Sequence, residues 1–462
     1  MADAYSDITY YSSRANTLRR QLRALAANDP RRPDLERRLG EMRRGGQVTR
    51  TEARDALTAR IIAHATLSAN TDVGELLTEH WFNHFNVDAE KVYWAAADYR
   101  GAIQRGMCGR FDQLLTTVAK HPAMLMYLDN FRSTAGAINE NYARELIELH
   151  TFGDDLYRFY QQKDVVNVAR VLSGWSVAFA PDGPDRYLPV FRFYSGAHDG
   201  ARVRLFDTAN RGIPLTLEDA TGAAAVGRGE ALLRYLASHP ATRRNVCGKL
   251  MRKLIGEAPA ELVDGCVSDA VWGANGDLGA IYRFVLTRPE MWRSMALKEK
   301  NPFELLVSAY RAVRLPSGGL EQRWIQDNVT VLARLGLLPG RIPPPTGYKD
   351  ANIWISSGLL LSWNQQLFAA MPTTNLSLGS RRGTDLEAFY ATRVTADPSA
   401  TGLRRLGATI ARDVLAYPAL ALSTDEIYPA LLESDTSKDD RSRAPVRSYV
   451  HALLGHTSFL RK

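Results

Sequence analysis

Apolar residues recur at three- and four-residue intervals along most of this chain, and this helical periodicity limits its fold more than any other feature. The pattern predicts helices over residues 17–28, 32–44, 50–68, 70–86, 109–119, 123–129, 138–150, 161–173, 227–238, 241–255, 278–287 and 302–314. Since 45% of the 462 residues are apolar, the chain can bury a sizeable core. We therefore expect a mainly α protein with a large multi-helix body.

One region departs from the helical pattern. At about residues 175–220, the segments WSVAFA and YLPVFRFY alternate in a strand-like way among prolines and glycines. They predict a small β-ribbon or long ordered loop inserted into the helical body. We expect three parts: an arginine-rich helical segment (1–68), a helical core with the insertion (69–375), and a C-terminal helical segment packed on the core (376–462).

Two helix junctions in the predicted core share a pattern. LLTTVAKHPAML (114–125) and LLRYLASHPATR (232–243) each combine an apolar helix, a short polar break with proline, and a second helix. Proline ends the first helix and sets the first turn of the next. Similar segments occur at irregular intervals, so we predict no solenoid.

Positive charge is concentrated near the start of the chain. The net charge is +8, and residues 11–50 hold eleven arginines against four acidic residues. This composition predicts a solvated helical hairpin; the alternative is an arm for an anionic partner. Because no recognition motif accompanies the arginines, we do not expect nucleic acid as a partner.

Targeting signals and cysteines bear on the compartment. No apolar stretch approaches the about 20 residues of a membrane span, and no signal peptide is visible, so cytoplasmic placement is the default expectation. Cys108, Cys247 and Cys266 lack metal-ligand spacing, which predicts buried small side chains. One pair can still form a disulfide if the protein is exported.

The segment HWFNHFNV places His80 and His84 four residues apart, in the middle of an apolar helical arc. Two imidazoles at this spacing can bind a metal ion or form hydrogen bonds inward. The alternative is a pair of core histidines bound to backbone carbonyls. Asn83, between them, is a candidate for substrate binding.

The segment NENYARELIELHTFG (139–153) concentrates titratable residues on one helical face. Its catalytic candidates are Asn141, Arg144, Glu145 and Glu148. Glu145 and Glu148 are separated by about 60° around a helix, so they can divide acid and base roles beside a cleft. If this face meets bulk water, it is a solvated stripe with ion pairs from Arg144 to Glu140 and Glu148.

Three further positions complete the predicted ligand set. His150 ends the same helix towards its apolar side, where the helix dipole favours the protonated imidazole. His198 and Asp199 lie between glycines in the insertion. They can bring an oriented imidazole to a cleft, or they can form a turn in which the Asp199 side chain caps its own backbone. With His84, these residues are the candidate ligands of a divalent metal ion.

Aromatic residues provide the remaining substrate-binding candidates. The segment IPPPTGY ends at Tyr348, and its prolines enforce an extended backbone. Tyr348, and Trp175 from the insertion, are candidates for a groove that binds sugars or peptides. Packing of 342–348 across the helical body is the alternative.

Several familiar catalytic motifs are missing. The chain contains no Walker A loop, GxSxG elbow, HExxH, CxxC pair or dinucleotide glycine motif. This argues against the common nucleotide-dependent and serine-hydrolase functions.

Taken together and in this order, HWFNHFNV, NENYARELIELHTFG, PPPTGY and the terminal ALLGHTSFLRK resemble the bacterial family catalogued as domain of unknown function 1800. The resemblance implies a largely helical fold. It also implies that many relatives are exported, and that a sulfatase-like protein encoded nearby is a candidate partner. The family supplies no established catalytic residues to carry over.

These observations lead to an enzyme as the main hypothesis. The cleft would lie between helices 70–86 and 138–150 with the 175–220 insertion as its lid, and the reaction would be metal-assisted hydrolysis or lyase-type cleavage of a polar polymer or conjugate. The first alternative is a non-catalytic helical partner or scaffold serving a neighbouring hydrolase. The second is an intracellular tailoring enzyme of specialised metabolism.

Overall fold

The computed structural model describes residues 21–22, 32–67, 72–153, 159–181, 187–207, 213–256, 258–294, 298–312 and 322–349, with Trp354, Gly358, Trp363 and Thr409. Most of the predicted helix 17–28 lies outside these residues. Apart from Thr409, so does the predicted C-terminal segment 376–462.

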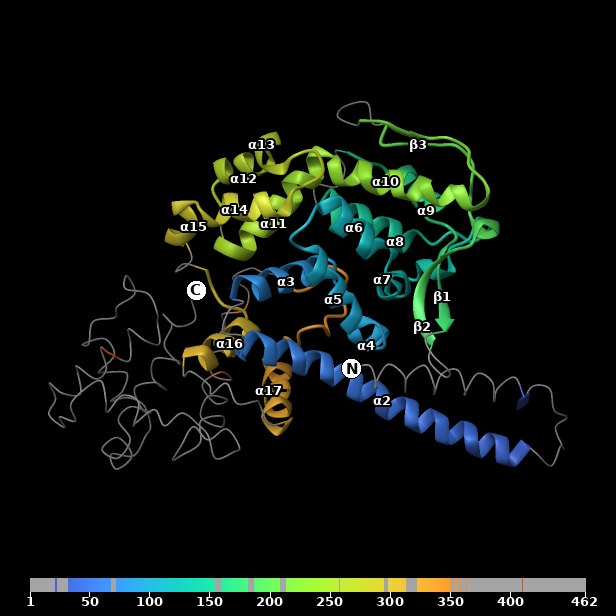
Figure 1. Ribbon diagram of the computed structural model, residues 1–462, viewed down its shortest axis with the longest axis horizontal. Helices are drawn as coiled ribbons and strands as arrows, with labels where there is room; N and C mark the ends of the chain where they lie inside the picture. The colour runs from blue at the N-terminus through green and yellow to red at the C-terminus, as the bar shows by residue number, and fades with distance from the viewer. Residues whose placement is uncertain are drawn as a thin grey trace.

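The fold is mainly α, as the apolar periodicity predicts (Figure 1). The first part of the chain forms α2 (Arg32–Leu67), α3 (Asp72–His84), α4 (Ala89–Val92), α5 (Ala96–Gly106), α6 (Phe111–Lys120), α7 (Pro122–Tyr127), η1 (Asn130–Arg132), α8 (Glu140–Glu145), η2 (Leu146–Thr151) and α9 (Gln162–Val171). After the insertion follow η4 (Gly222–Ala225), α10 (Val226–Ser238), α11 (Pro240–Ile255), α12 (Ala260–Val267), α13 (Asp269–Trp272), α14 (Leu278–Leu286), α15 (Pro289–Ser294), α16 (Pro302–Ala312) and α17 (Gln322–Arg334).

The N-terminal helix α2 is continuous where the sequence predicts two helices. Gly45 and Gly46 lie inside it, since each glycine costs a helix only about 1 kcal/mol. Its first half extends away from the body in Figure 1, whereas its second half contacts α3, α16 and α17. Leu57 and Ile61 belong to the same buried cluster as the side chains of α3. The core therefore continues across the predicted boundary at residue 68.

The insertion contains the predicted β-ribbon. β1 (Trp175–Pro181) pairs antiparallel with β2 (Tyr187–Phe193), and a second pair joins β3 (Val203–Leu205) to β4 (Leu215–Leu217). η3 (Ser195–Ala197) lies between the two pairs. The insertion packs on α7, α9 and α10. This position ties it to the helices that precede and follow it in the chain.

The two His-Pro junctions share one local geometry. His121 precedes α7 and His239 precedes α11, and the Nδ1 atom of each accepts a hydrogen bond from the backbone N–H two residues later, at 3.1 and 3.2 Å. Both residues have extended backbone, and proline follows in the first helical turn. The imidazole therefore acts as the N-cap, a role usually taken by a small polar side chain.

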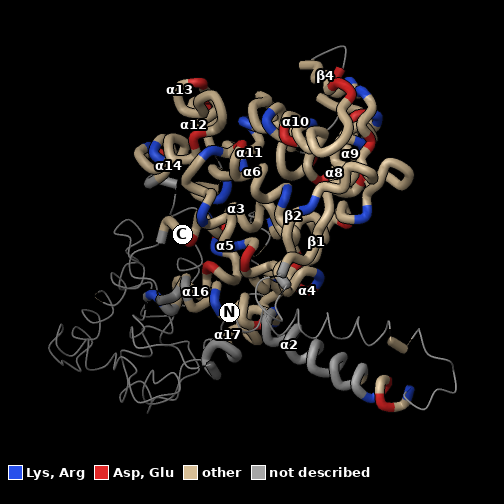
Figure 2. The backbone as a smooth tube through the Cα atoms, turned by 45° about the vertical axis from the view of Figure 1, so that its right-hand side comes forward, with Lys and Arg blue, Asp and Glu red and all other residues tan. Residues whose placement is uncertain are grey.

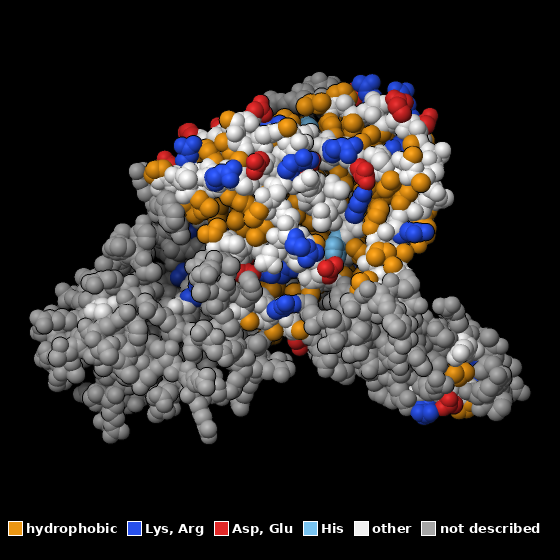
Figure 3. All heavy atoms as spheres, viewed as in Figure 1, with side chains coloured by type: hydrophobic (Ala, Val, Ile, Leu, Met, Phe, Trp, Pro, Cys, Tyr) orange, Lys and Arg blue, Asp and Glu red, His pale blue; other side chains and the backbone are white. Residues whose placement is uncertain are grey.

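Charged residues are interspersed over the described body. In Figure 2, basic and acidic residues are scattered over the described body, and the face in Figure 3 shows them separated by apolar areas. Within the described part of the chain, no helix is long and apolar enough to cross a membrane.

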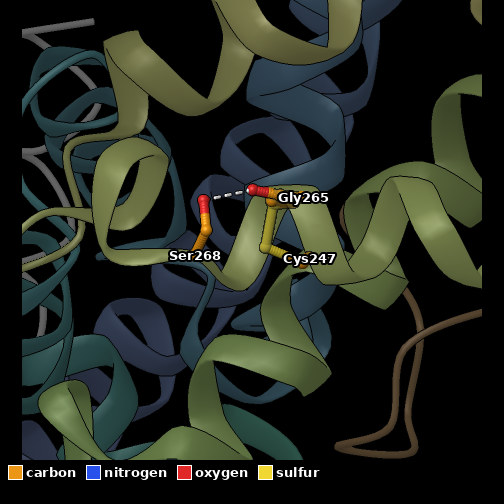
Figure 4. The surroundings of a disulfide bond; sticks show 4 residues. Cys247, Gly265 and Ser268 are labelled. Atoms are coloured by element: carbon orange, nitrogen blue, oxygen red, sulfur yellow. Dashed lines mark hydrogen bonds between the residues drawn. A yellow bond between two sulfur atoms is a disulfide. The ribbon is translucent and has the colours of Figure 1, made fainter.

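A disulfide joins α11 to α12. Cys247 and Cys266 are both fully buried and bonded to each other, with their Cα atoms 6.1 Å apart (Figure 4). Beside the bond, the Ser268 hydroxyl donates to the Gly265 carbonyl at 2.6 Å. The expectation of buried cysteines is confirmed for Cys247 and Cys266 and wrong for Cys108, which is exposed. The pairing corresponds to the alternative raised for an exported protein.

We expect the Cys247→Ser, Cys266→Ser double variant to lose about 3 kcal/mol of unfolding free energy, because the bond closes a short loop in the unfolded chain. Urea unfolding of both proteins measures the loss, and peptide mapping without reductant verifies the pairing. The variant Cys108→Ser is the control, since Cys108 is exposed and unpaired. Equal stability of the double variant and this control would contradict the expectation.

Candidate functional site

The helix that carries the candidate carboxylates changes type in its middle. α8 ends at Glu145, and residues Leu146–Thr151 form the π-helix η2. The Phe152 N–H donates to the Ile147 carbonyl, five residues back, at 2.8 Å. Angles calculated for an α-helix therefore do not apply beyond Glu145, and the predicted 60° between Glu145 and Glu148 does not describe their arrangement. Such π-helical turns occur frequently at functional sites.

Side chains from two other helices bind the last carbonyls of η2. Lys249 Nζ donates to the Leu149 carbonyl at 2.9 Å, and Asn245 Nδ2 donates to the Thr151 carbonyl at 2.7 Å. From α3, His84 Nε2 lies 3.2 Å from the carbonyl oxygen of His150. The carbonyls at a helix end lack partners within the helix, so these contacts satisfy them and place positive charge at the negative end of the dipole.

The residues on α11 form a polar stripe that the sequence analysis missed. Asn245, Lys249 and Lys253 are spaced four residues apart, which places them on one helical face. The spacing was a visible signal, but nothing in the local sequence identifies the carbonyls that the stripe binds. We call these three residues the α11 stripe.

The two predicted metal-ligating histidines His84 and His150 do meet. Their side chains are 7% and 1% exposed, and their ring centroids lie 6.3 Å apart. Burial, with a smaller effect of the nearby Lys249 ammonium, lowers the pKa of His150 to about 3 and holds that of His84 well below its ordinary value. The expectation that the helix dipole favours a protonated His150 is wrong, because burial outweighs the dipole.

The two candidate carboxylates occupy different environments. Glu148 accepts a hydrogen bond from the Tyr160 hydroxyl at 2.7 Å and lies 3.6 Å from the Arg144 guanidinium. Glu145 is half-buried, and no hydrogen bond or ion pair joins its side chain to any residue in the described part of the chain. Burial, and then the charge of Glu148, raise the pKa of Glu145, whereas Arg144 opposes the rise.

The other two catalytic candidates have structural partners. Arg144 forms the predicted ion pairs with Glu140, at 3.3 Å, and Glu148, and it also donates to Gln162 at 2.9 Å. Asn141 is exposed, and its side-chain amide lies 3.4 Å from the Leu128 carbonyl. This part of the face matches the solvated stripe that the sequence analysis gave as the alternative.

Residues 342–348, which we call the strap, cross the end of α3. Asn83 exchanges two hydrogen bonds with the Tyr348 backbone, each 2.9 Å long. Asn86 donates to the carbonyls of Ile342 and Pro344 at 2.8 Å. The strap therefore packs on the helical body, and the Asn83 side chain is used to hold it there.

Tyr348 also reaches a buried ion cluster. Lys253 is fully buried, and its ammonium lies 3.0 Å from carboxylate oxygens of Glu79 and Glu304. The Tyr348 hydroxyl donates to Glu79 and lies 3.1 Å from Lys253 Nζ. Charges from α3, α11 and α16 thus compensate one another in the interior. Lys253, Glu79 and Glu304 were not predicted, because their sequence positions are far apart.

The predicted pair His198 and Asp199 belongs to a different polar cluster. His198 Nδ1 lies 2.9 Å from the Ser173 carbonyl and its Nε2 lies 3.3 Å from the Arg228 guanidinium. Since a carbonyl only accepts and a guanidinium only donates, Nδ1 carries the proton and the Nε2 lone pair faces Arg228. Asp199 binds Arg170 at 2.7 Å. These contacts occupy the groups that a metal ion would need.

The remaining aromatic candidate is a core residue. Trp175 is fully buried, its ring packs against Phe191, and a Cβ on Gly229 would overlap the indole.

Asp199 also accepts a hydrogen bond from the Ala201 N–H at 3.1 Å, which is the self-capping turn that the sequence analysis gave as an alternative.

The four predicted ligands therefore divide into two pairs. Of the three stretches expected to converge, helices α3 and α8–η2 meet, while the insertion holds His198 and Asp199 against α9 and α10. Among the described residues, no group of three or more His, Cys, Asp or Glu side chains is placed to hold a metal ion.

Comparison with known proteins supports the resemblance noted in the sequence. The family model described as "Protein of unknown function (DUF1800)" matches residues 5–461, which is nearly the whole chain. The chain belongs to this family. No curated protein and no solved structure matches the chain. The family assignment therefore leaves the reaction and the ligands to be argued from the site itself.

We expect Gly153→Ala to destabilise the protein by about 1–3 kcal/mol, because Gly153 has φ +90° and an added Cβ would lie 2.8 Å from Asn245 Cγ. The substitution would disturb the contact between the α11 stripe and the end of η2. Gly136→Ala is the matched control, since a Cβ there would meet no atom within 4 Å. Urea unfolding of both variants is the measurement, and equal effects would contradict the prediction.

We expect His150 to make folding sensitive to acid. Its pKa falls from 6.5 to about 3 on folding, so below pH 6.5 the unfolded chain binds a proton that the folded chain does not. The contribution of His150 to the unfolding free energy is complete above pH 6.5, and about 2 kcal/mol of it is lost at pH 5. Urea unfolding of wild type and His150→Gln, measured above pH 6.5 and again at pH 5, tests this. The variant should lose less stability on acidification, and an identical loss would refute the assignment.

Proposed function

We propose that this protein is an enzyme, and that Glu145 and Glu148 transfer protons in hydrolytic or lyase-type cleavage of a polar polymer or conjugate. The observation that supports this most directly is the state of Glu145. It is a half-buried carboxyl group that has a raised pKa and, among the described residues, no hydrogen bond or ion pair. A structural carboxylate is usually paired, whereas a proton donor needs a raised pKa and an open oxygen.

The environments of the two carboxyl groups suggest separate roles. Glu148 accepts a hydrogen bond from the Tyr160 hydroxyl and forms an ion pair with Arg144. Its negative charge in turn favours the protonated form of Glu145. In this proposal Glu145 is the general acid, and Glu148 keeps it protonated or acts as the base. Neighbouring carboxyl groups with different environments divide acid and base roles in this way.

The strap supplies a candidate wall for the substrate. Tyr127 interacts electrostatically with Glu145, and its hydroxyl donates to the Pro343 carbonyl. Pro343 and Pro344 are exposed on the strap. A polymer lying along these prolines would come close to the Glu145 carboxyl group.

The alternative of a non-catalytic partner has one observation in its favour. Asn83 and Tyr348, which were candidates for substrate binding, are instead used in contacts between the strap and the body. Such networks fix the packing of helices without chemistry. A sulfatase-like protein is the partner proposed for this role, and co-purification from the native host tests it.

The disulfide bears on the second alternative, an intracellular tailoring enzyme of specialised metabolism. Disulfides persist in oxidising compartments and are rare in the cytosol. The Cys247–Cys266 bond therefore favours an exported enzyme over an intracellular tailoring enzyme.

We expect Glu145→Gln to reduce cleavage by about 100-fold or more, because an amide cannot donate the proton that the leaving group needs. A panel of polysaccharides and peptide polymers is assayed for new reducing ends, new amines and the ultraviolet absorbance of unsaturated lyase products. Glu140→Gln is the matched control, since Glu140 lies on the same helix and binds Arg144 from an exposed position.

A second measurement does not require the substrate. Carbon-13 NMR titration of labelled glutamates, assigned with Glu145→Gln, should place the pKa of Glu145 above its ordinary value. Glu148→Gln should lower it. A Glu145 that titrates as an ordinary exposed carboxyl group would contradict the proposal.

A further inference from the structure

The two His-Pro junctions differ in what the second ring nitrogen of the histidine contacts. Nδ1 of each ring accepts a backbone hydrogen bond, so in the neutral imidazole the proton lies on Nε2. His121 Nε2 lies 3.2 Å from Asp98 Oδ2. His239 Nε2 is inaccessible to solvent and, among the described residues, has no hydrogen-bond partner. A carboxylate is therefore in place to balance a second proton on His121 but not on His239.

Aromatic rings enclose His239. It is 3% exposed, and its ring centroid lies 4.4 Å from that of Phe152, 5.4 Å from that of Phe159 and 5.7 Å from that of Tyr235. Such surroundings cannot hydrate an imidazolium ion. Burial accordingly lowers the pKa of His239 from 6.5 to about 4.

The polar side chains around His239 are used elsewhere. The neighbouring titratable and charged residues are Tyr160, Asp164, Tyr235 and Arg243. The Tyr160 hydroxyl donates to Glu148 at 2.7 Å, and the Asp164 carboxylate accepts from two backbone N–H groups at 2.8 Å. Arg243 forms an ion pair with Asp269 at 2.5 Å, and the Tyr235 hydroxyl donates to a backbone carbonyl. Within the described part of the chain, no carboxylate forms an ion pair with His239.

A second proton would remove the cap of α11. It can bind only at Nδ1, which then points an N–H group at the Ala241 N–H, 3.2 Å away. The first turn of α11 thereby loses the partner of one N–H group and gains a buried charge beside it. Both changes favour an open junction, in which the His239 ring is hydrated.

Two contacts link this junction to the C-terminal end of η2. Phe152, which follows η2, packs on the His239 ring. Asn245, in the second turn of α11, donates to the Thr151 carbonyl at 2.7 Å. A displacement of the first turn of α11 therefore disturbs the contacts that hold the end of the π-helix.

We propose that the His239 junction is an acid-sensitive switch, in which protonation of the imidazole opens the first turn of α11 and loosens its hold on the end of η2. The open junction binds the proton with the ordinary histidine pKa of 6.5, and burial opposes the same proton in the closed junction. The closed form is therefore fully favoured above pH 6.5 and loses this advantage as the pH falls towards 4. The switch does not rest on the proposed function, since neither Glu145 nor Glu148 titrates in it.

The test measures hydrogen exchange of backbone amides by mass spectrometry, in the full chain with its disulfide, at pH 7.5 and at pH 5. Protection factors, referred to unstructured peptide at the same pH, should fall about 30-fold at residues 241–243 on acidification, because the open junction gains that factor in population. Residues 147–153 should lose protection with them. The junction at His121 should lose less, since Asp98 balances its second proton.

His239→Asn separates this switch from a general effect of acid. Asparagine accepts the backbone hydrogen bond as an N-cap but does not titrate, so protection at residues 241–243 should be retained at pH 5. His121→Asn is the matched control, and it should keep the wild-type loss at α11, as should His150→Gln. Equal protection of the wild type at both pH values, or the same loss in folded His239→Asn, would overturn the proposal. Protection lost at residues 241–243 alone would refute the link to η2. Circular dichroism at both pH values verifies that each variant is folded.

Discussion

The capture of the C-terminal end of η2 by side chains of α3 and α11 is the interaction on which the rest of the site depends. Carbonyls at a helix end must find partners, and here Asn245, Lys249 and His84 supply them. The α11 stripe then continues to Lys253, whose ammonium binds carboxylates of α3 and α16. One helix face thus connects the π-helix, α3 and α16, and the disulfide joins that same helix to α12.

This arrangement creates two chemical environments on one short segment. The inner side of η2 is buried and aromatic, and it keeps His84 and His150 neutral because burial penalises their charged forms. Towards solvent, Glu148 stays close to Arg144 and Tyr160, while the neighbouring Glu145 has no such partners among the described residues.

Apolar periodicity predicted the helices, and strand-like alternation predicted the ribbon. The meeting of His84 with His150 was expected only from the concentration of titratable residues in their two segments. The contacts of His198 and Asp199 could not be predicted in the same way, since their partners Arg228 and Arg170 come from other elements of the fold. The π-helix was also beyond the helical wheel, which assumes 100° per residue. Similarly, the disulfide needed the spatial position of α12, because cysteine spacing alone does not specify a pairing.

The use of the polar face of α3 restricts where a substrate can bind. The Glu79 carboxylate forms an ion pair with Lys253 and accepts a hydrogen bond from the Tyr348 hydroxyl. The side-chain amides of Asn83 and Asn86 form hydrogen bonds with the strap. His80, Trp81 and His84 of the same helix are buried in the core. The polar side chains on which a cleft wall at α3 would depend are thus engaged in packing contacts. The half-buried Glu145, on α8, is by contrast a titratable group with no hydrogen bond or ion pair among the described residues, and burial raises its pKa.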